Sequence, residues 1–479
     1  MSISRRDCLK LGALGGGAAM LGGCANLAGR IAQRPERLAL PTAGAEENLR
    51  LVHRTTFGPR PGDVARAKAL GKEGYVDSLL KAGEDEEPRL QFLLNRLDVF
   101  QMDAYETQEL PENEVLRQLQ AAALLRAVYG RHQLRERMVD FWTNHFNIYS
   151  RKGLSAFRKA TDETKVVRQH ALDTFPNLLK ASAHSPAMLM FLDNQGNTSG
   201  HPNENYAREI MELHSLGVKG GYTQKDVQEV ARCFTGWTIE RRFLRHRWTF
   251  RFDPDLHDNG TKRVLGHTIP GGGGEKDADI VLQILSTHPS TAHFIASKLC
   301  AAFLGADGGK WTDQTAQTYL NTGGDIRAML RPLLLSKDLI DSPPILKRPF
   351  DLIASSLRAL DADTDGGKDV QNHLEKMGEP LYQWPMPDGY PTKTSAWTGS
   401  MLPRWNFAHQ VASGAVGGTR YDSTSLKEPE LIYETLLGSR PASSGSLLLD
   451  SVAREIKNHP EDSTSACFLC LASPEFQWR

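Results

Sequence analysis

Residues 112–129 read ENEVLRQLQAAALLRAVY, and the apolar side chains in this stretch recur at intervals of three and four residues. This spacing places them on one face of an α-helix, as is typical of a helix that buries a single face. The same period predicts further helices at residues 134–146, 164–181, 204–216, 223–234, 278–287, 326–335 and 346–360. We therefore predict a mainly α fold, a globular body of many helices.

One segment breaks the helical period. Between residues 238 and 252, apolar and polar side chains partly alternate, which is typical of a β-hairpin. Residues 263–269 are a candidate third strand. We expect a small β-hairpin or a three-stranded sheet inserted among the helices.

Length and charge limit the organisation and the partners of the chain. The 479 residues exceed the usual size of one compact domain, so two lobes with a boundary near residues 361–372 are one expectation. Lysine and arginine together number 57, as do aspartate and glutamate. Because nucleic-acid binding needs a basic excess on some face, we expect no nucleic-acid partner.

The first 23 residues have the features of an export signal. Arg5 and Arg6 precede a short, mildly apolar run that ends at Gly23, and this run is too short for a permanent membrane-spanning helix. The paired arginines resemble the twin-arginine class, although Cys8 stands where that class usually has an aromatic residue. The resemblance implies export in the folded state, a route that permits a cofactor to be loaded beforehand.

Residues 21–24 read LGGC and resemble a bacterial lipobox, whose cysteine carries a lipid. We expect cleavage before Cys24, a lipid-anchored tether over residues 24–44 and a helical body over residues 45–479. No later stretch approaches 18 uninterrupted apolar residues, so the lipid on Cys24 is the predicted membrane contact. The expected location is the bacterial cell envelope, facing the periplasm or the surface.

Cys467 and Cys470 have the spacing of a redox or metal-binding pair, but no second pair accompanies them. Core packing or one local disulfide is the interpretation that we favour.

The predicted helix over residues 204–216 carries the strongest candidate site. On a helical wheel of 100° per residue, one face collects the side chains Glu204, Asn205, Arg208, Glu209 and Glu212. One interpretation is a solvated face with weak ion pairs. The other is a cleft in which crowding raises the pKa of a glutamate enough for acid–base catalysis, or attracts a cation. The four charged residues are therefore candidate catalytic groups.

A second candidate lies in the turn that follows the expected hairpin. His257 and Asp258 crowd this turn together with Asp253. The cluster could bind a divalent cation, or Asp258 could orient His257 as a general base. A polar turn is the structural alternative. His145 lies on an aromatic helix face, where a hydrogen-bonded core histidine is favoured over a metal ligand.

The third candidate is an acidic loop between two predicted helices. Asp361, Asp363 and Asp365 occupy positions one, three and five of an EF-hand-like pattern, but position twelve is Asn372 and not a bidentate glutamate. The sequence thus allows a weak calcium site or a simple acidic turn. Further along, aromatic residues among prolines and glycines could bind sugars or peptides, or anchor an irregular segment, which we favour; they are Trp384, Tyr390, Trp397 and Trp405.

Six motifs occur in order at residues 54–62 (RTTFGPRPG), 141–146 (FWTNHF), 202–213 (PNENYAREIMEL), 221–227 (GYTQKDV), 234–237 (FTGW) and 257–262 (HDNGTK). Asp226 in the fourth motif also forms a predicted helix N-cap with Thr223. Together the motifs resemble the bacterial family called domain of unknown function 1800, from about residue 45 to the end. The resemblance implies an exported, mostly helical protein, often encoded beside another uncharacterised protein that is a candidate envelope partner. It supplies no reaction.

Two classes of function follow. The first is an envelope enzyme that uses the carboxylate and arginine face with a divalent metal to hydrolyse or modify an envelope polymer. Oxygen ligands would favour Mg, Ca or Mn, and added histidine would favour Fe or Zn. The second is a non-catalytic envelope lipoprotein that binds or assembles a partner. Burial of Glu204, Arg208 and Glu212 beside His257 would support the enzyme.

The lipid anchor predicts the behaviour of a single substitution. Cys24→Ser removes the thiol that would carry the lipid, so we expect this variant to move from the detergent phase to the aqueous phase in phase-partitioning experiments. Unchanged partitioning would refute the anchor.

Overall fold

The computed structural model describes residues 47–81, 83, 87–103, 105–242, 248–305, 308–439 and 446–479. The predicted signal, Cys24 and the tether lie outside the described residues. Ala43–Arg479 form one compact unit, and the following description concerns that unit alone.

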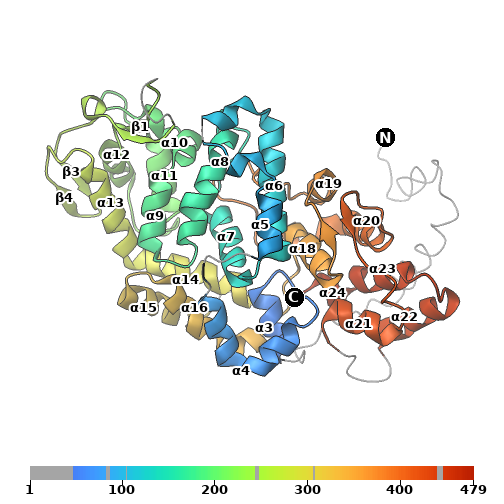
Figure 1. The fold of residues 1–479 in the computed structure, drawn as a ribbon. Helices are drawn as coiled ribbons and strands as arrows, with labels where there is room; N and C mark the ends of the chain where they lie inside the picture. The colour runs from blue at the N-terminus through green and yellow to red at the C-terminus, as the bar shows by residue number, and fades with distance from the viewer. Residues whose placement is uncertain are drawn as a thin grey trace, which may run out of the picture. The chain divides into compact units, whose positions relative to one another are not determined.

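Helices dominate the unit, so the predicted mainly α fold is confirmed (Figure 1). The first half contains α3 (Glu47–Thr55), α4 (Asp63–Leu80), α5 (Pro88–Leu94), α6 (Glu112–Tyr129), α7 (Gln133–His145), α8 (Ala156–Asp162), the π-helix η4 (Glu163–Arg168), α9 (Phe175–Ala183), α10 (Pro186–Phe191), α11 (Glu204–Glu212) and α12 (Gln224–Cys233). The second half contains α13 (Lys276–Thr287), α14 (Pro289–Leu304), α15 (Lys310–Thr322), α16 (Ile326–Leu334), α17 (Lys337–Asp341), α18 (Pro349–Ala359), α19 (Lys368–Lys376), α20 (Met401–Ala412), α21 (Pro429–Leu437), α22 (Leu447–Asn458), α23 (Thr464–Ala472) and α24 (Pro474–Gln477).

Short 3₁₀ turns connect several of these helices. They are η2 (Asp98–Phe100), η3 (Glu106–Glu109), η5 (Asn194–Gly196), η6 (Pro254–Leu256), η7 (Thr394–Ala396) and η8 (Thr398–Ser400).

One predicted helix is divided in the structure. The period over residues 164–181 suggests a single helix, but the chain forms η4, then a break, then α9. Thr174 caps α9, and Pro176 lies in its first turn. Because proline has no backbone N–H and disfavours helix in the preceding residue, a continuous helix through this point is excluded.

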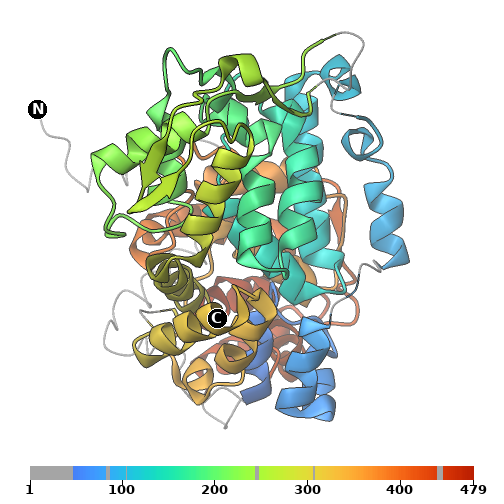
Figure 2. The same cartoon turned by 90° about the vertical axis from the view of Figure 1, so that its left-hand side faces the viewer.

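The predicted hairpin forms from β1 (Trp237–Ile239) and β2 (Phe250–Phe252), which pair antiparallel. The candidate third strand does not join it. Residues 262–269 make their own hairpin from β3 (Lys262–Val264) and β4 (His267–Ile269). The reason is local, since Leu265 and Gly266 both have positive φ, as the tight turn of a two-residue hairpin requires. Figure 2 shows this inserted segment above the helices α14–α16.

Asp226 attaches the second hairpin to α12. Its carboxylate completes a capping box with Thr223, as the sequence predicts. The same carboxylate accepts a hydrogen bond from the backbone N–H of Leu265 at 2.7 Å. A third pair of short strands, β5 (Asp363–Thr364) and β6 (Thr419–Arg420), was not expected.

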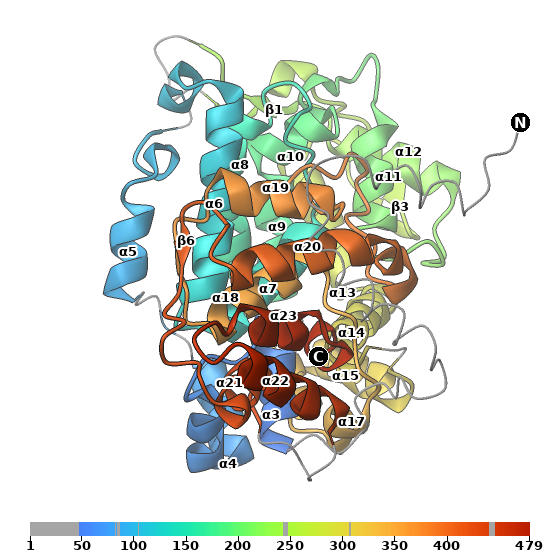
Figure 3. The same ribbon diagram turned by 90° about the vertical axis from the view of Figure 1, so that its right-hand side faces the viewer.

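Two large hydrophobic clusters fill the unit. The first is built mainly from α7, α9, α11, α12, α13, α14 and α16. The second is built mainly from α6 and α18–α24, which Figure 3 shows from the side. Leu360 and Val370 both belong to the second cluster, so this cluster includes residues on both sides of the segment where a lobe boundary was expected. Cys467 and Cys470 are buried and unpaired within it.

Buried ion pairs connect the two clusters. Glu163 of η4 accepts hydrogen bonds from Arg126 of α6 at 2.7 Å and from the Tyr382 hydroxyl at 2.5 Å. Arg168, also on η4, donates twice to Glu136 of α7, at 2.6 and 2.8 Å. Low-dielectric surroundings make each unpaired charge costly, so these contacts restrict how the clusters can pack together. We call these five side chains the ionic junction.

The junction predicts a large effect for a nearly isosteric change. In Glu163→Gln, the buried Arg126 loses its carboxylate partner, so we expect the free energy of unfolding to fall by about 3 kcal/mol. Urea denaturation followed by circular dichroism measures this change. The matched control is Glu461→Gln, which removes an exposed pair with Lys427 and should leave the transition nearly unchanged. Equal effects of the two substitutions would contradict the role of the junction.

Candidate functional site

Helix α11 separates its side chains into the two predicted faces. Asn203 caps the helix by accepting a hydrogen bond from the Asn205 backbone at 2.9 Å. Tyr206 and Ile210 are buried on the apolar face. The side chain of Asn205 donates to the carbonyl of Leu192 at 3.1 Å, so its described contact is structural.

The first turn of the charged face is an ordinary surface ion pair. Arg208 donates to Glu204 at 3.1 Å and to Gln224 at 2.9 Å. The side chains of Arg208 and Glu204 are 40% and 34% exposed. Such a pair contributes little to stability. For Glu204 and Arg208 the solvated interpretation therefore fits better than the buried cleft.

The second turn of the same face is different. Glu212 accepts a hydrogen bond from the Tyr222 hydroxyl at 3.0 Å. Burial, with further contributions from the charges of Glu212 and Asp388, raises the pKa of Glu209. This is the crowding of carboxylates that the sequence predicts, although Asp388 lies far away along the chain.

Lys298, a half-buried lysine of α14, lies beside His145. Lys298 donates to Nδ1 of His145 at 2.9 Å, and the other ring nitrogen of His145 lies 3.1 Å from the carbonyl of His214. That carbonyl can only accept, so His145 carries its proton on Nε2 and offers Nδ1 to Lys298. Burial lowers the pKa of Lys298 to about 8, against an opposing effect of Asp388.

Both histidines are neutral in this setting. Burial, followed by the charge of Lys298, lowers the pKa of His145 well below its ordinary value and that of His214 to about 3. His145 is thus a hydrogen-bonded core histidine, as expected, and it also positions an amine.

A loop over residues 384–390 carries Asp388, whose charge acts on both Glu209 and Lys298. Asn144 holds this loop by donating to the carbonyl of Tyr390 at 3.0 Å and accepting from its N–H at 2.7 Å. Asn147 donates to the carbonyl of Trp384 at 2.9 Å. Gly389 has a φ of 76°, and a Cβ there would lie 2.1 Å from the Asn144 carbonyl, so only glycine fits.

We call Glu209, Glu212, Tyr222, Lys298 and Asp388, with His145 behind the lysine, the Lys298 cluster. Sequence reasoning found Glu209, Glu212 and His145 but missed the other three. A signal existed for Lys298, which is the only lysine, arginine or acidic residue in the mostly apolar helix α14. Nothing local connects Asp388 to α11.

The aromatic side chains of the irregular segment act as anchors. Tyr390 and Trp397 are buried with Leu346, and Trp384 packs against them. This agrees with the favoured interpretation of these residues, while Trp405 of α20 is only half-buried.

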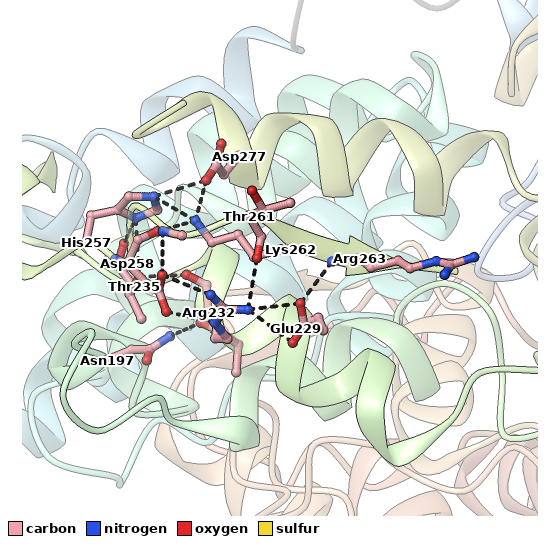
Figure 4. A network of polar contacts seen from close by, with 12 residues as sticks. Asn197, Glu229, Arg232, Thr235, His257, Asp258, Thr261, Lys262, Arg263 and Asp277 are labelled. Carbon is pink, nitrogen blue, oxygen red and sulfur yellow. Dashed lines mark hydrogen bonds and ion pairs between the residues drawn. The ribbon is translucent and has the colours of Figure 1, made fainter. Parts of the chain in front are cut away.

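His257 lies in a separate polar network between α12, β3 and α13 (Figure 4). Its ring nitrogens lie 2.8 Å from the Thr235 carbonyl and 3.2 Å from the Asp277 carboxylate. Lys262 donates to the same carboxylate at 2.6 Å. The side chains of His257, Lys262 and Asp277 are fully buried. Asp277 takes the position that was predicted for Asp258.

Asp258 has a different partner. It accepts two hydrogen bonds from Arg232, at 2.7 and 3.1 Å, and this contact lowers the pKa of Asp258. Asp253 accepts from Arg251 at 2.5 Å in a similar way. The expectation that Asp258 orients His257 is therefore wrong, because an arginine competes for the carboxylate.

The acidic loop is also committed to internal contacts. Asp363 pairs with Arg89, and Asp365 and Asp369 accept hydrogen bonds from backbone N–H groups at 2.7 and 3.0 Å. Asp361 has a positive φ at the start of the turn. These carboxylates thus stabilise the turn through internal hydrogen bonds and an ion pair. The described geometry gives no support for a calcium site here.

Over all the residues that the structure describes, no group of three or more His, Cys, Asp or Glu side chains is arranged to hold a metal ion. This applies to the predicted set His257, Asp258 and Asp253 and to the acidic loop alike. The same described helices include none long and apolar enough to cross a membrane.

A small cavity lies beside the Asn144 contact. It offers about 50 Å³ to a water-sized group and is lined by Glu136, Asp140, Glu163 and Glu379, with Tyr390 at one side. Burial raises the pKa of Glu379 to about 7, although Arg348 opposes this. This cavity is an extension of the ionic junction.

Comparison with known proteins places the chain in a family. The family model described as protein of unknown function (DUF1800) matches residues 50–478. The chain belongs to the DUF1800 family. No curated protein and no solved structure matches.

Three of the DUF1800 motifs meet at the Lys298 cluster. The motif at residues 141–146 supplies His145 and Asn144, that at residues 202–213 supplies Glu209 and Glu212, and that at residues 221–227 supplies Tyr222. The cluster is therefore where motifs distant in this DUF1800 chain come together.

Lys298 makes a testable prediction about pH. The pKa of Lys298 falls from 10.5 in the unfolded chain to about 8 in the folded protein. Between pH 10.5 and pH 8 the unfolded state therefore binds the proton more strongly, and the free energy of unfolding falls as the pH is lowered. Below pH 8 this loss of stability is complete. Relative to wild type, Lys298→Met should therefore become more stable as the pH is lowered from about 10 to 8. Urea denaturation at several pH values measures this difference.

The control for this experiment is Lys310→Met, because Lys310 is 69% exposed. Its stability difference from wild type should stay constant over the same range. A flat profile for Lys298→Met would show that Lys298 is not desolvated as described.

Proposed function

We propose that this DUF1800 protein is an exported, lipid-anchored envelope enzyme whose Lys298 cluster carries out acid–base chemistry on an envelope polymer. The observation that supports it best is that the charge of Asp388 acts both on a desolvated lysine, Lys298, and on a carboxylate of raised pKa, Glu209, each of which is half-buried. Groups whose environments move their pKa values toward neutrality are characteristic of acid–base catalysis.

Each group has a distinct role in this proposal. Neutral Lys298 accepts a proton from a hydroxyl or water, and the carboxyl group of Glu209, whose raised pKa increases the fraction that is protonated, donates one to a leaving oxygen. His145 is a positioning residue, because it directs the Lys298 amine through Nδ1. The carboxylates of Glu212 and Asp388 make the site acidic, which favours neutral or cationic polymer segments over polyanions.

The metal-dependent form of the hypothesis has less support. Arg232 and Arg251 occupy the carboxylates of Asp258 and Asp253, and no three donors converge among the described residues. The proposal therefore assigns proton transfer to the side chains of the chain itself.

Activity measurements test the proposal. The full exported protein is incubated with purified peptidoglycan and neutral envelope glycans, and altered fragments are detected by mass spectrometry. We expect Lys298→Met and Glu209→Gln each to lower the rate by about 100-fold or more. The mechanism needs neutral Lys298 and protonated Glu209 together, so the wild-type rate should follow a bell-shaped pH profile that falls at both low and high pH.

Glu204→Gln is the matched control, because Glu204 is on the same helix but belongs to the exposed pair. Its rate should stay close to wild type. Unchanged activity in Lys298→Met would overturn the assignment. Stoichiometric metal in the wild type that is lost in the double variant Glu209→Gln, Glu212→Gln would favour the metalloenzyme instead.

One observation favours the alternative of a partner-binding lipoprotein. Val218, just beyond α11, is 72% exposed, and Met386, in the loop of Asp388, is 56% exposed. Exposed apolar side chains on both segments suit docking of a protein partner. Loss of partner capture in Val218→Asp, with no polymer modified by the wild type, would support this alternative.

A further inference from the structure

Three distant segments meet on the side of the fold where α3 lies. The segment 345–347 pairs with residues 477–479 through backbone hydrogen bonds of 2.8 to 2.9 Å. Arg54 of α3 donates to the side chain of Ser342 at 3.0 Å and to the carbonyl of Pro343 at 2.6 Å. Helix α3 is thereby attached beside the paired segments.

Basic side chains from all three segments gather at this meeting point. We call Arg50, His53, Arg54, Lys347 and Arg479 the basic cluster. Arg54 is 0%, Lys347 1% and Arg50 5% exposed, and the Arg479 side chain is 8% exposed. Burial, and then the positive charges of the other four, lower the pKa of His53 well below its ordinary value.

Several nitrogen atoms of the basic cluster have no hydrogen-bond partner among the residues that the structure describes. They are Nε and Nη1 of Arg54, Nζ of Lys347, Nε and Nη1 of Arg479, and Nδ1 of His53, all of them buried. Buried polar atoms almost always have a partner, so such a group needs an explanation, for which an ion is a recognised candidate. Five of these nitrogens belong to Arg54, Lys347 and Arg479 and are donors, and an acceptor with several oxygens could satisfy more than one of them.

The acids of the neighbourhood do not meet this need. Asp351 is bound to Arg137 and lies 3.9 Å from Arg479. Asp140 and Glu379 are paired with Arg348. Lys347 instead lies over the ring of Phe476, 3.8 Å from its centre. Burial and the nearby arginines lower the pKa of Lys347 to about 7.

Other charged groups face the same place. Arg404 donates to the carbonyl of Lys347 at 2.8 Å and adds positive charge without supplying an acceptor. Positive charge therefore exceeds negative charge at the basic cluster.

We propose that the basic cluster is a binding site for a small inorganic oxyanion, of the phosphate or sulfate type. Planar guanidinium groups and an amine match the oxygens of such an anion, and charge-assisted hydrogen bonds of this kind are strong. A bound oxyanion would satisfy the unpaired nitrogens and tie α3 to the segments 345–347 and 477–479. This site is separate from the Lys298 cluster and does not depend on the proposed enzyme.

Thermal unfolding and calorimetry test the site. The full-length protein is titrated at constant ionic strength with sodium phosphate, sodium sulfate or sodium chloride. We expect phosphate or sulfate to raise the Tm progressively with concentration, with saturable heat of binding, whereas chloride should give neither effect. Equal responses to all three salts, or the absence of any binding heat with phosphate and sulfate, would overturn the proposal.

A matched pair of variants locates the site. Lys347→Met keeps the bulk of the side chain over Phe476 but removes one charge, so it should fold and bind phosphate or sulfate at least about tenfold more weakly. Lys337→Met removes an 87% exposed lysine and should bind as the wild type does. If Lys347→Met retains wild-type affinity, the anion binds elsewhere and the assignment fails; if it does not fold, the wild-type titration still decides.

Discussion

The structure depends on one constraint: the charged side chains buried between its two hydrophobic clusters must each keep a partner of opposite charge. The two hydrophobic clusters do not merge through apolar contacts alone. They meet across Glu163, Glu136, Arg126 and Arg168, whose ion pairs are almost fully buried. Such pairs are not a large source of net stability. They are satisfied only in one arrangement of α6, α7 and η4, and so they restrict the packing of the whole unit.

The same constraint reaches the Lys298 cluster. Tyr382 donates to Glu163 in the junction, and the chain continues from there into the loop that carries Asp388. Helix α7 contributes to both places, since Glu136 belongs to the junction and Asn144 and His145 support the loop and the lysine. The packing of the ionic junction therefore helps to fix the position of the Lys298 cluster. A rigid scaffold of this kind suits catalytic side chains, which must be placed accurately.

The basic cluster shows the opposite situation. In the junction every charge has a partner of opposite sign, whereas around Lys347 and Arg479 several buried donors have none in the described part of the chain. Both places lie in low-dielectric surroundings, so the contrast concerns pairing and not burial. An external acceptor explains it with the fewest assumptions. The family comparison adds membership of DUF1800 but no reaction, so chemical conclusions rest on these contacts.

The sequence by itself determined the helical character, the two faces of α11, the capping role of Asp226 and the first hairpin. Each of these features depends on residues only a few positions apart in the chain. Such short-range relations can be read from the periodicity of apolar residues and from the preferences of turn and cap residues. Only the tertiary structure decided that Lys298 binds His145, 153 residues away, that Asp277 and not Asp258 faces His257, and that Asp388 approaches Glu209. A helical wheel shows which face is polar, but it does not say which distant side chain that face will meet, because this is settled by the packing of whole helices and the pairing of their buried charges.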